Sequence, residues 1–160
     1  MASSRETKRR RGVEISHIEV AAFCHATEDC FRVEESVRNV FPQELRKLIR
    51  INRVEKEGYY GNPISIITAR ISDERYAELI TKHLAVSLGP LEKAVLKSTF
   101  DLRYDPKTGR FVVRFSKQDL LLGRLRITDS DDVVKVVFHL KSAKKRSDAL
   151  NFFRNTGLIA

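Results

Sequence analysis

The sequence predicts an α+β fold, a two-layer sandwich in which helices cover one face of a largely antiparallel sheet. Short segments of alternating apolar and polar residues occur in neighbouring pairs, which is typical of antiparallel strands. Segments with apolar residues at helical spacing lie between these pairs. The chain has 160 residues, of which 42% are hydrophobic and 32% charged, so one domain can bury a core beneath a charge-rich surface.

The first half of the chain begins with a clear strand pattern. Ile18, Val20 and Ala22 alternate with a mixed set of residues, which predicts one apolar face. Residues 27–29 then supply an N-cap hydroxyl and two carboxylates, which favour the start of a helix. In chain order we expect a strand at 15–25, a helix that Pro42 closes, and a short helical or turn segment at 42–48. Strands at 49–57 and 64–71 and a helix at 72–88 follow.

The second half continues the mixture of helices and strands. Pro90 suits the first position of a helix, and residues 105–109 form a turn with proline and glycine. We expect a helix at 91–98, extended chain at 100–104, and strands at 110–116, 124–128 and 133–141. Residues 118–123 form a short helical turn or a bulged link, and a short terminal helix covers 147–154.

The charge distribution divides the chain into a domain and two basic tails. The 30 Lys and Arg exceed the 21 Asp and Glu, for a net charge of +9. We expect residues 1–12 to form a basic, disordered tail, 13–142 the single domain, and 143–160 a basic extension that contains the terminal helix. The excess charge favours a polyanionic partner, and solvated charge on a soluble protein is the alternative.

Composition also bears on location and on the cysteines. The first residues carry no apolar segment behind their charges, and no run approaches 18 apolar residues, so we expect no signal peptide, no membrane span and a cytoplasmic protein. Cys24 and Cys30 are separated by five residues, which suits neither a zinc knuckle nor a redox pair. We therefore expect two reduced thiols among apolar neighbours.

Catalytic patterns are weak. The four histidines, His17, His25, His83 and His139, show no H-x-x-x-H or H-E-x-x-H spacing, so we expect no metal site. The sequence also has no G-x-G-x-x-G, Walker or G-x-S-x-G motif, so we expect no cofactor and no enzyme. His25 beside Glu28 and Asp29 is the one acid–base candidate. A strand-end histidine next to a capped helix explains the same residues without catalysis.

A basic sheet face is better supported. Alternation places the cations of three late strands on one side, where they would meet phosphates if the strands pair as a meander. An ordinary solvent face of an antiparallel sheet is the alternative. The expected phosphate contacts are Arg110, Arg114, Lys117, Arg124, Arg126 and Lys135, with Gln118 beside them.

The loop at 58–63 is the second candidate contact. Tyr59 and Tyr60 stand in it and could stack on bases or pack over a hairpin end, with Asn62 after them. Gly58 and Gly61 suggest tight backbone turns.

Three segments together resemble a known family. They are residues 22–29 (AFCHATED), 57–64 (EGYYGNPI) and 114–124, which holds RFSKQ and LGR. In this order and spacing they are similar to small archaeal proteins described as RNA-binding or as predicted exosome subunits. The resemblance covers about residues 13–142 and implies a fold similar to the large-subunit ribosomal protein that binds 5S rRNA. Its signature residues fall here on His25, Glu28, Asp29, Gly58, Gly61, Asn62, Lys117, Gln118 and Gly123. Ser116 departs from the pattern, since the family tends to place an aspartate there.

The sequence thus predicts a non-catalytic RNA-binding protein that acts on structured RNA, such as ribosomal RNA or RNA in a processing assembly. The alternative is a protein-interaction subunit of an RNA-processing complex whose charge is incidental. A metal-dependent nuclease is the third hypothesis, and the oligomeric state stays open.

Overall fold

The computed structural model describes residues 12–58 and 61–160 of the chain. Within these residues the six strands form one antiparallel sheet in the order β2-β3-β1-β6-β5-β4. The strands are β1 (Glu14–His25), β2 (Asn52–Glu57), β3 (Pro63–Ile71), β4 (Tyr104–Asp105), β5 (Arg110–Ser116) and β6 (Val133–Lys141). The helices are α2 (Cys30–Arg38), the 3-10 turn η1 (Gln43–Leu45), α3 (Glu74–Ser87), α4 (Pro90–Ser98), α5 (Phe100–Arg103), α6 (Lys117–Leu121) and α7 (Arg146–Thr156).

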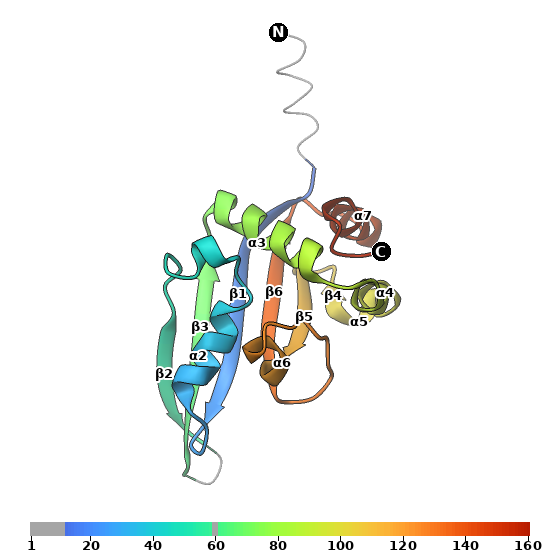
Figure 1. Ribbon diagram of the computed structural model, residues 1–160. Coiled ribbons are helices and arrows are strands. Elements are labelled where there is room, and N and C mark those ends of the chain that lie inside the picture. Colours follow the sequence, from blue (N-terminus) through green and yellow to red (C-terminus); the bar gives the residue numbers. More distant parts are fainter. Residues whose placement is uncertain (1–11, 59–60) are drawn as a thin grey trace, which may run out of the picture.

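The helices and the sheet form two layers, with the core between them. Helices α2, α3 and α6 lie across the same face of the sheet (Figure 1). On β1 the residues Ile18, Val20 and Ala22 point into this layer and are buried, while their neighbours are more exposed. The predicted α+β sandwich is therefore confirmed. The likeness to the 5S rRNA-binding ribosomal protein stays a prediction.

Local sequence explains where the main helices begin. The carboxylate of Asp29, rather than the hydroxyl of Thr27, caps α2 by accepting a hydrogen bond from the backbone N of Phe31 (3.0 Å). Asp73 caps α3 in the same way from Tyr76 N (3.0 Å), and Pro90 occupies the first turn of α4.

An aromatic cluster closes the C-terminal side of the core. The ring of Phe111 on β5 lies 4.4 Å from that of Phe153 on α7 and 5.3 Å from that of Phe100 on α5, measured between centroids. Phe153 is fully buried, as are Leu158 and Ile159 after the helix. The predicted terminal helix is thus present as α7, and its apolar side packs on the sheet.

Two predicted elements differ in the structure. The sequence predicts extended chain at 100–104, but α5 occupies 100–103, because a helical turn buries Phe100 and lets the Arg103 Nε donate to the Thr99 hydroxyl (2.8 Å). It also predicts a strand at 124–128 between β5 and β6, yet β5 pairs directly with β6. That segment lies along the other edge of β5 and makes one isolated bridge there, in which Ser116 N donates to Arg126 O (2.8 Å) and Thr128 N donates to Arg114 O (3.1 Å). On its outer side, Ile127 N donates to the Glu92 carboxylate (2.9 Å).

The cysteines are also a correction. Cys24 at the end of β1 and Cys30 at the start of α2 form a disulfide, not two reduced thiols. Their Cα atoms are 5.6 Å apart, within the range that a disulfide requires, because the short loop between them turns the chain back. Among the described residues, no helix combines the length and the apolar character needed to cross a membrane.

Candidate nucleic-acid interface

The side of the sheet away from the helices, here called the open face, carries several cations. Residues that pair across strands share a face, and Arg114 on β5 pairs with Lys135 on β6. Arg110 lies four residues before Arg114, an even spacing that places it on the same side of β5, and it pairs with His139. Arg110 and Arg114 are exposed and Lys135 is half-buried, so three cations occupy nearby positions on two paired strands.

A fourth cation of the open face was missed at the level of sequence. Arg70 on β3 is exposed and pairs with Glu19 on β1, which places it on the open face as well. The alternation of β3 was visible in the sequence, but only the register of β3 against β1 brings Arg70 to this surface.

Apolar side chains share the open face with these cations. Phe23 on β1 pairs with Ile66 on β3, which pairs with Val54 on β2. Phe23 is 53% exposed and Val54 is 51% exposed. A base or a sugar could therefore contact an aromatic ring here while phosphates meet the cations.

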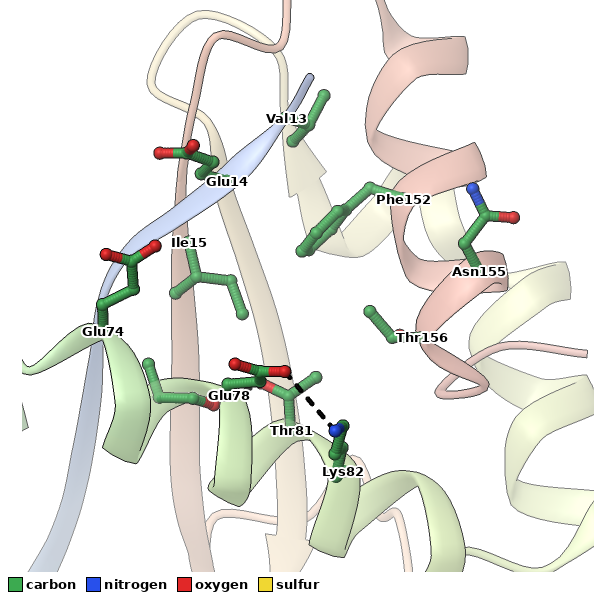
Figure 2. Close-up of a pocket in the computed structure, with 11 residues that line it drawn as sticks. Val13, Glu14, Ile15, Glu74, Glu78, Thr81, Lys82, Phe152, Asn155 and Thr156 are labelled. Carbon is green, nitrogen blue, oxygen red and sulfur yellow. Dashed lines mark hydrogen bonds and ion pairs between the residues drawn. The ribbon is translucent and has the colours of Figure 1, made fainter. Parts of the chain in front are cut away.

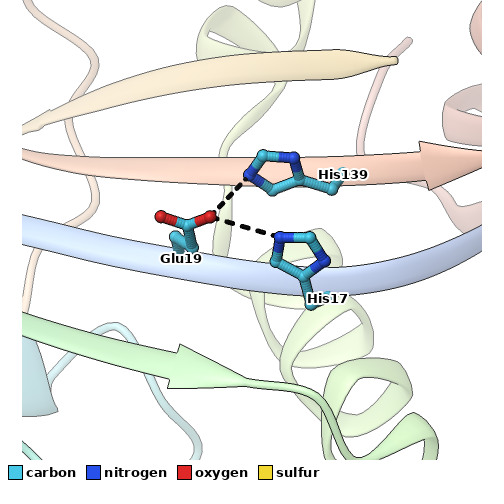
Figure 3. Close-up of side chains that lie close together, drawn as sticks. All are labelled: His17, Glu19 and His139. Carbon is cyan, nitrogen blue, oxygen red and sulfur yellow. Dashed lines mark hydrogen bonds and ion pairs between the residues drawn. The ribbon is translucent and has the colours of Figure 1, made fainter. Parts of the chain in front are cut away.

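Two histidines and a carboxylate meet on the open face (Figure 3). The Oε1 atom of Glu19 lies 3.2 Å from Nε2 of His17 and 2.9 Å from Nε2 of His139, and the two imidazole rings stack with centroids 3.9 Å apart. Burial lowers the pKa of His139, and the adjacent His17 lowers it further, so its neutral form is favoured. Local spacing could not reveal this cluster, because His139 comes from a different strand.

Lys117 is not part of the open face, contrary to the sequence-based expectation. Its side chain is only 3% exposed, and its Nζ donates to the backbone oxygen of Phe23 (2.8 Å). The same Nζ lies 2.9 Å from Asp132 and 3.2 Å from Glu28. Two carboxylates therefore neutralise this ammonium, and it offers no free charge to a phosphate.

Neighbouring side chains complete this buried-lysine cluster, defined here as Glu28, Lys117, Gln118 and Asp132. Gln118 donates through Nε2 to the Asp132 carboxylate (3.3 Å). The hydrogen bond from Lys117, together with that from Gln118, holds the pKa of Asp132 below its usual range. Asp132 was missed in the sequence, where it fits a polar turn.

The acid–base candidates have structural partners. Glu28 faces Lys117, and Asp29 caps α2. The ring of His25 is exposed, and its Nε2 lies 4.0 Å from Glu28 Oε1. Each of these three residues therefore has a partner among the described residues.

Ser116 preserves a local role despite its departure from the family pattern. Its hydroxyl accepts a hydrogen bond from the backbone N of Asp119 (3.2 Å) and so caps α6. An aspartate at this position can make the same bond, because both residue types are good N-caps.

The glycines of the candidate loop have backbone roles. Gly58 donates to the backbone oxygen of Asn62, and a Cβ at Gly58 would lie 2.6 Å from that oxygen. Gly61 has a φ of +77°, which favours glycine. The carbonyl of Asn62 thus closes the turn, while Tyr59 and Tyr60 lie outside the described residues.

The remaining expected contacts lie at the edge of the sheet. Arg124 and Arg126 are exposed in the segment beside β5, and the Nε of Arg126 lies 3.8 Å from the carboxylate of Asp119. Gly123, with a φ of +78°, turns the chain from α6 into this segment. These two arginines therefore flank the other edge of β5 and do not lie on the paired strands β5 and β6.

A cavity of about 360 Å³ lies beside the first residues of β1, between α3 and α7 (Figure 2). Ile15 and Phe152 provide apolar walls, and Glu14, Glu74 and Glu78 surround them. Three carboxylates repel phosphate, so this cavity is a poor candidate for contact with RNA.

Comparisons with known proteins agree with this description. The family model described as RNA binding matches residues 17–140. An RNA-binding protein of Pyrococcus abyssi is 30% identical over 139 residues, which cover 86% of this chain and 90% of that protein. An uncharacterized protein of Methanocaldococcus jannaschii is 34% identical over 128 residues, 79% of this chain and 85% of that protein.

Solved structures share the fold. The crystal structure of a protein from Archaeoglobus fulgidus has a TM-score of 0.77 and 27% identity, covering 89% of this chain and 99% of that one. A protein from Methanothermobacter thermautotrophicus has a TM-score of 0.72 at 24% identity, covering 89% and 97%. Because the family model matches most of the chain, this protein belongs to the RNA-binding family.

Proposed function

We propose that this protein binds structured RNA through the open face of its sheet and carries out no catalytic step. The observation that carries the proposal is the adjacency of Arg110, Arg114 and Lys135 on a face that the helices leave uncovered. Arg110 and Arg114 are four residues apart on β5, about 13 Å along the strand, and neighbouring strands are about 5 Å apart, so these cations can engage separate phosphates.

The composition of the open face supports a structured target. Sequence-specific reading of single strands commonly uses two or three aromatic rings on a sheet. Among the described residues of the open face, Phe23 is the exposed aromatic side chain. Cations with one ring suit recognition of backbone shape better than recognition of several splayed bases.

The test is a binding titration against a structured ribosomal RNA fragment over a series of salt concentrations. We compare the full chain with the variant R110Q/R114Q/K135Q. Each lost phosphate contact lowers the salt slope by about 0.7–0.9, so we expect a fall of about 2 to 3 units and a weaker affinity at every salt concentration.

A matched control changes the same amount of charge on the helix side. The variant R75Q/K97Q/R154Q removes three exposed cations from α3, α4 and α7. We expect its salt slope to stay within about one unit of the unaltered protein, because only diffuse attraction is lost. Equal losses in both triple variants would refute the open face as the binding surface.

Association with an RNA-processing complex, including an exosome, is a separate part of the proposal. RNA-mediated association should be lost when an extract is treated with nuclease before purification. A stable protein partner that survives this treatment would instead favour the assembly-subunit alternative.

A further inference from the structure

We infer that His17, Glu19 and His139 form a binding site for one divalent transition-metal ion of the zinc class. The three side chains lie on the open face, on the paired strands β1 and β6. Their candidate ligand atoms all lie within 4.8 Å of one another. The inference depends on the structure of this cluster and holds whether or not the open face binds RNA.

The distances fit a tetrahedral ion. Ligand atoms that each lie about 2.0–2.1 Å from zinc are about 3.3 Å from one another in a tetrahedral arrangement. Glu19 Oε1 lies 3.2 Å from the Nε2 of His17 and 2.9 Å from that of His139. Because the two rings stack nearly parallel, they must rotate out of the stack before both nitrogen lone pairs point at one ion.

His139 provides a second, independent observation. Its Nε2 is buried and makes no hydrogen bond within the described residues, although the Glu19 oxygen is close by. A buried ring nitrogen without a hydrogen bond costs stability, and a metal ion in the cluster would satisfy it. His17 and His139 are mostly buried, with side chains 15% and 18% exposed, so water competes little for their ring nitrogens.

The donor set and the neighbouring charges indicate the class of metal. Two imidazoles and one carboxylate suit zinc, cobalt or nickel, whereas magnesium and calcium require mainly oxygen ligands. Arg110 pairs with His139 and Arg70 pairs with Glu19, so the surroundings do not attract cations by charge alone. Binding must therefore come mainly from ligation by the two imidazole nitrogens.

The first experiment titrates the full chain, with its disulfide intact so that thiols do not compete, with Zn²⁺ by calorimetry and with Co²⁺ by absorption. We expect one equivalent to bind and Co²⁺ to give the visible bands of a four- or five-coordinate ion. E19Q and H17Q should each weaken binding at least about tenfold. H83Q removes a histidine from α3 and should leave binding unchanged. No binding, or binding that survives both E19Q and H17Q, would overturn the inference.

A measurement on the unaltered protein guards against variants that fold poorly. Paramagnetic Co²⁺ should shift or broaden the amide resonances of residues 17–19 and of His139 before those of other strands. Effects centred on His25 or on the exposed carboxylates would show adventitious binding and would also overturn the inference.

Discussion

Replacing Lys117 by methionine separates a structural role from an RNA-contacting one. Methionine has a similar length but no charge, so the Lys117→Met variant leaves Glu28 and Asp132 without their shared cation and Phe23 without its hydrogen-bond donor. We therefore expect a clear loss of stability.

The size of this loss of stability depends on how exposed to water the partners of Lys117 are. Breaking a fully buried ion pair costs about 3–5 kcal/mol. Here Asp132 is 48% exposed and Glu28 is 25% exposed, so water compensates part of the loss for both carboxylates. The carbonyl of Phe23 loses a bond worth about 1–3 kcal/mol. We expect a total loss of about 3 kcal/mol, which lowers the Tm by about 6–12 °C in a chain of this size.

Urea denaturation and calorimetry measure this loss, with Lys141→Met as the matched control. Lys141 is 58% exposed and lies 3.3 Å from Glu14, so its replacement should change stability by at most about 0.5 kcal/mol. Adding E28Q and D132N to Lys117→Met removes the uncompensated charges and should restore part of the lost stability. A Lys117→Met variant within about 0.5 kcal/mol of the unaltered protein would refute this account.

The same variant tests the RNA contact. A buried, neutralised ammonium releases no counterions, so Lys117→Met should leave the salt slope of RNA binding unchanged while the protein is folded. Arg114→Gln should lower that slope by about 0.7–0.9. A fall of a full unit in Lys117→Met would mean that Lys117 does reach a phosphate.

Three further predictions concern stability. Reducing the disulfide, or replacing Cys24 and Cys30 by serine, should lower the free energy of unfolding by about 2 kcal/mol, because the closed loop is short. An unchanged urea midpoint would contradict this prediction. Gly58→Ala should lower the free energy of unfolding by about 1–3 kcal/mol, because the new Cβ would lie 2.6 Å from a backbone oxygen. At Gly89 a Cβ would meet open space, so Gly89→Ala should change stability little. Equal effects of the two variants in urea denaturation would contradict this. Burial lowers the pKa of His83 below its ordinary value of 6.5, so the unfolded chain binds more protons than the folded one. The free energy of unfolding should therefore fall as the pH drops below 6.5. The urea midpoint of the His83→Gln variant should depend less on pH than that of the unaltered protein, and an equal dependence would contradict this.

The sequence predicted the elements whose pattern is strong and local. Alternation located β1, β5 and β6, and the charged and proline boundaries located α3 and α4. It failed at residues 100–104, where five residues fit either a strand or a helical turn, and packing of Phe100 decides between them. It also failed at 124–128, where pairing depends on which edge of β5 is free.

The sequence predicted the position of candidate site residues only where the alternation along a single strand determines it. Alternation along β5 placed Arg110 and Arg114 on one face, which the structure bears out. Lys117 was misplaced because Ser116 ends the alternation by capping a helix, which turns the next side chain inward. The cluster of His17 and His139 needs the register of β1 against β6, and no local pattern carries that information.

The buried-lysine cluster and the open face are physically connected. Lys117 follows the last residue of β5, its Nζ binds the carbonyl of Phe23 on β1, and it faces Asp132, which directly precedes β6. One ammonium therefore joins the ends of three strands, and these same strands carry Phe23, Arg114 and Lys135 on the open face. Loss of Lys117 should therefore loosen the spacing of those groups while their own charges stay the same. Lys117 can thus support the geometry of the open face without adding a charge to it.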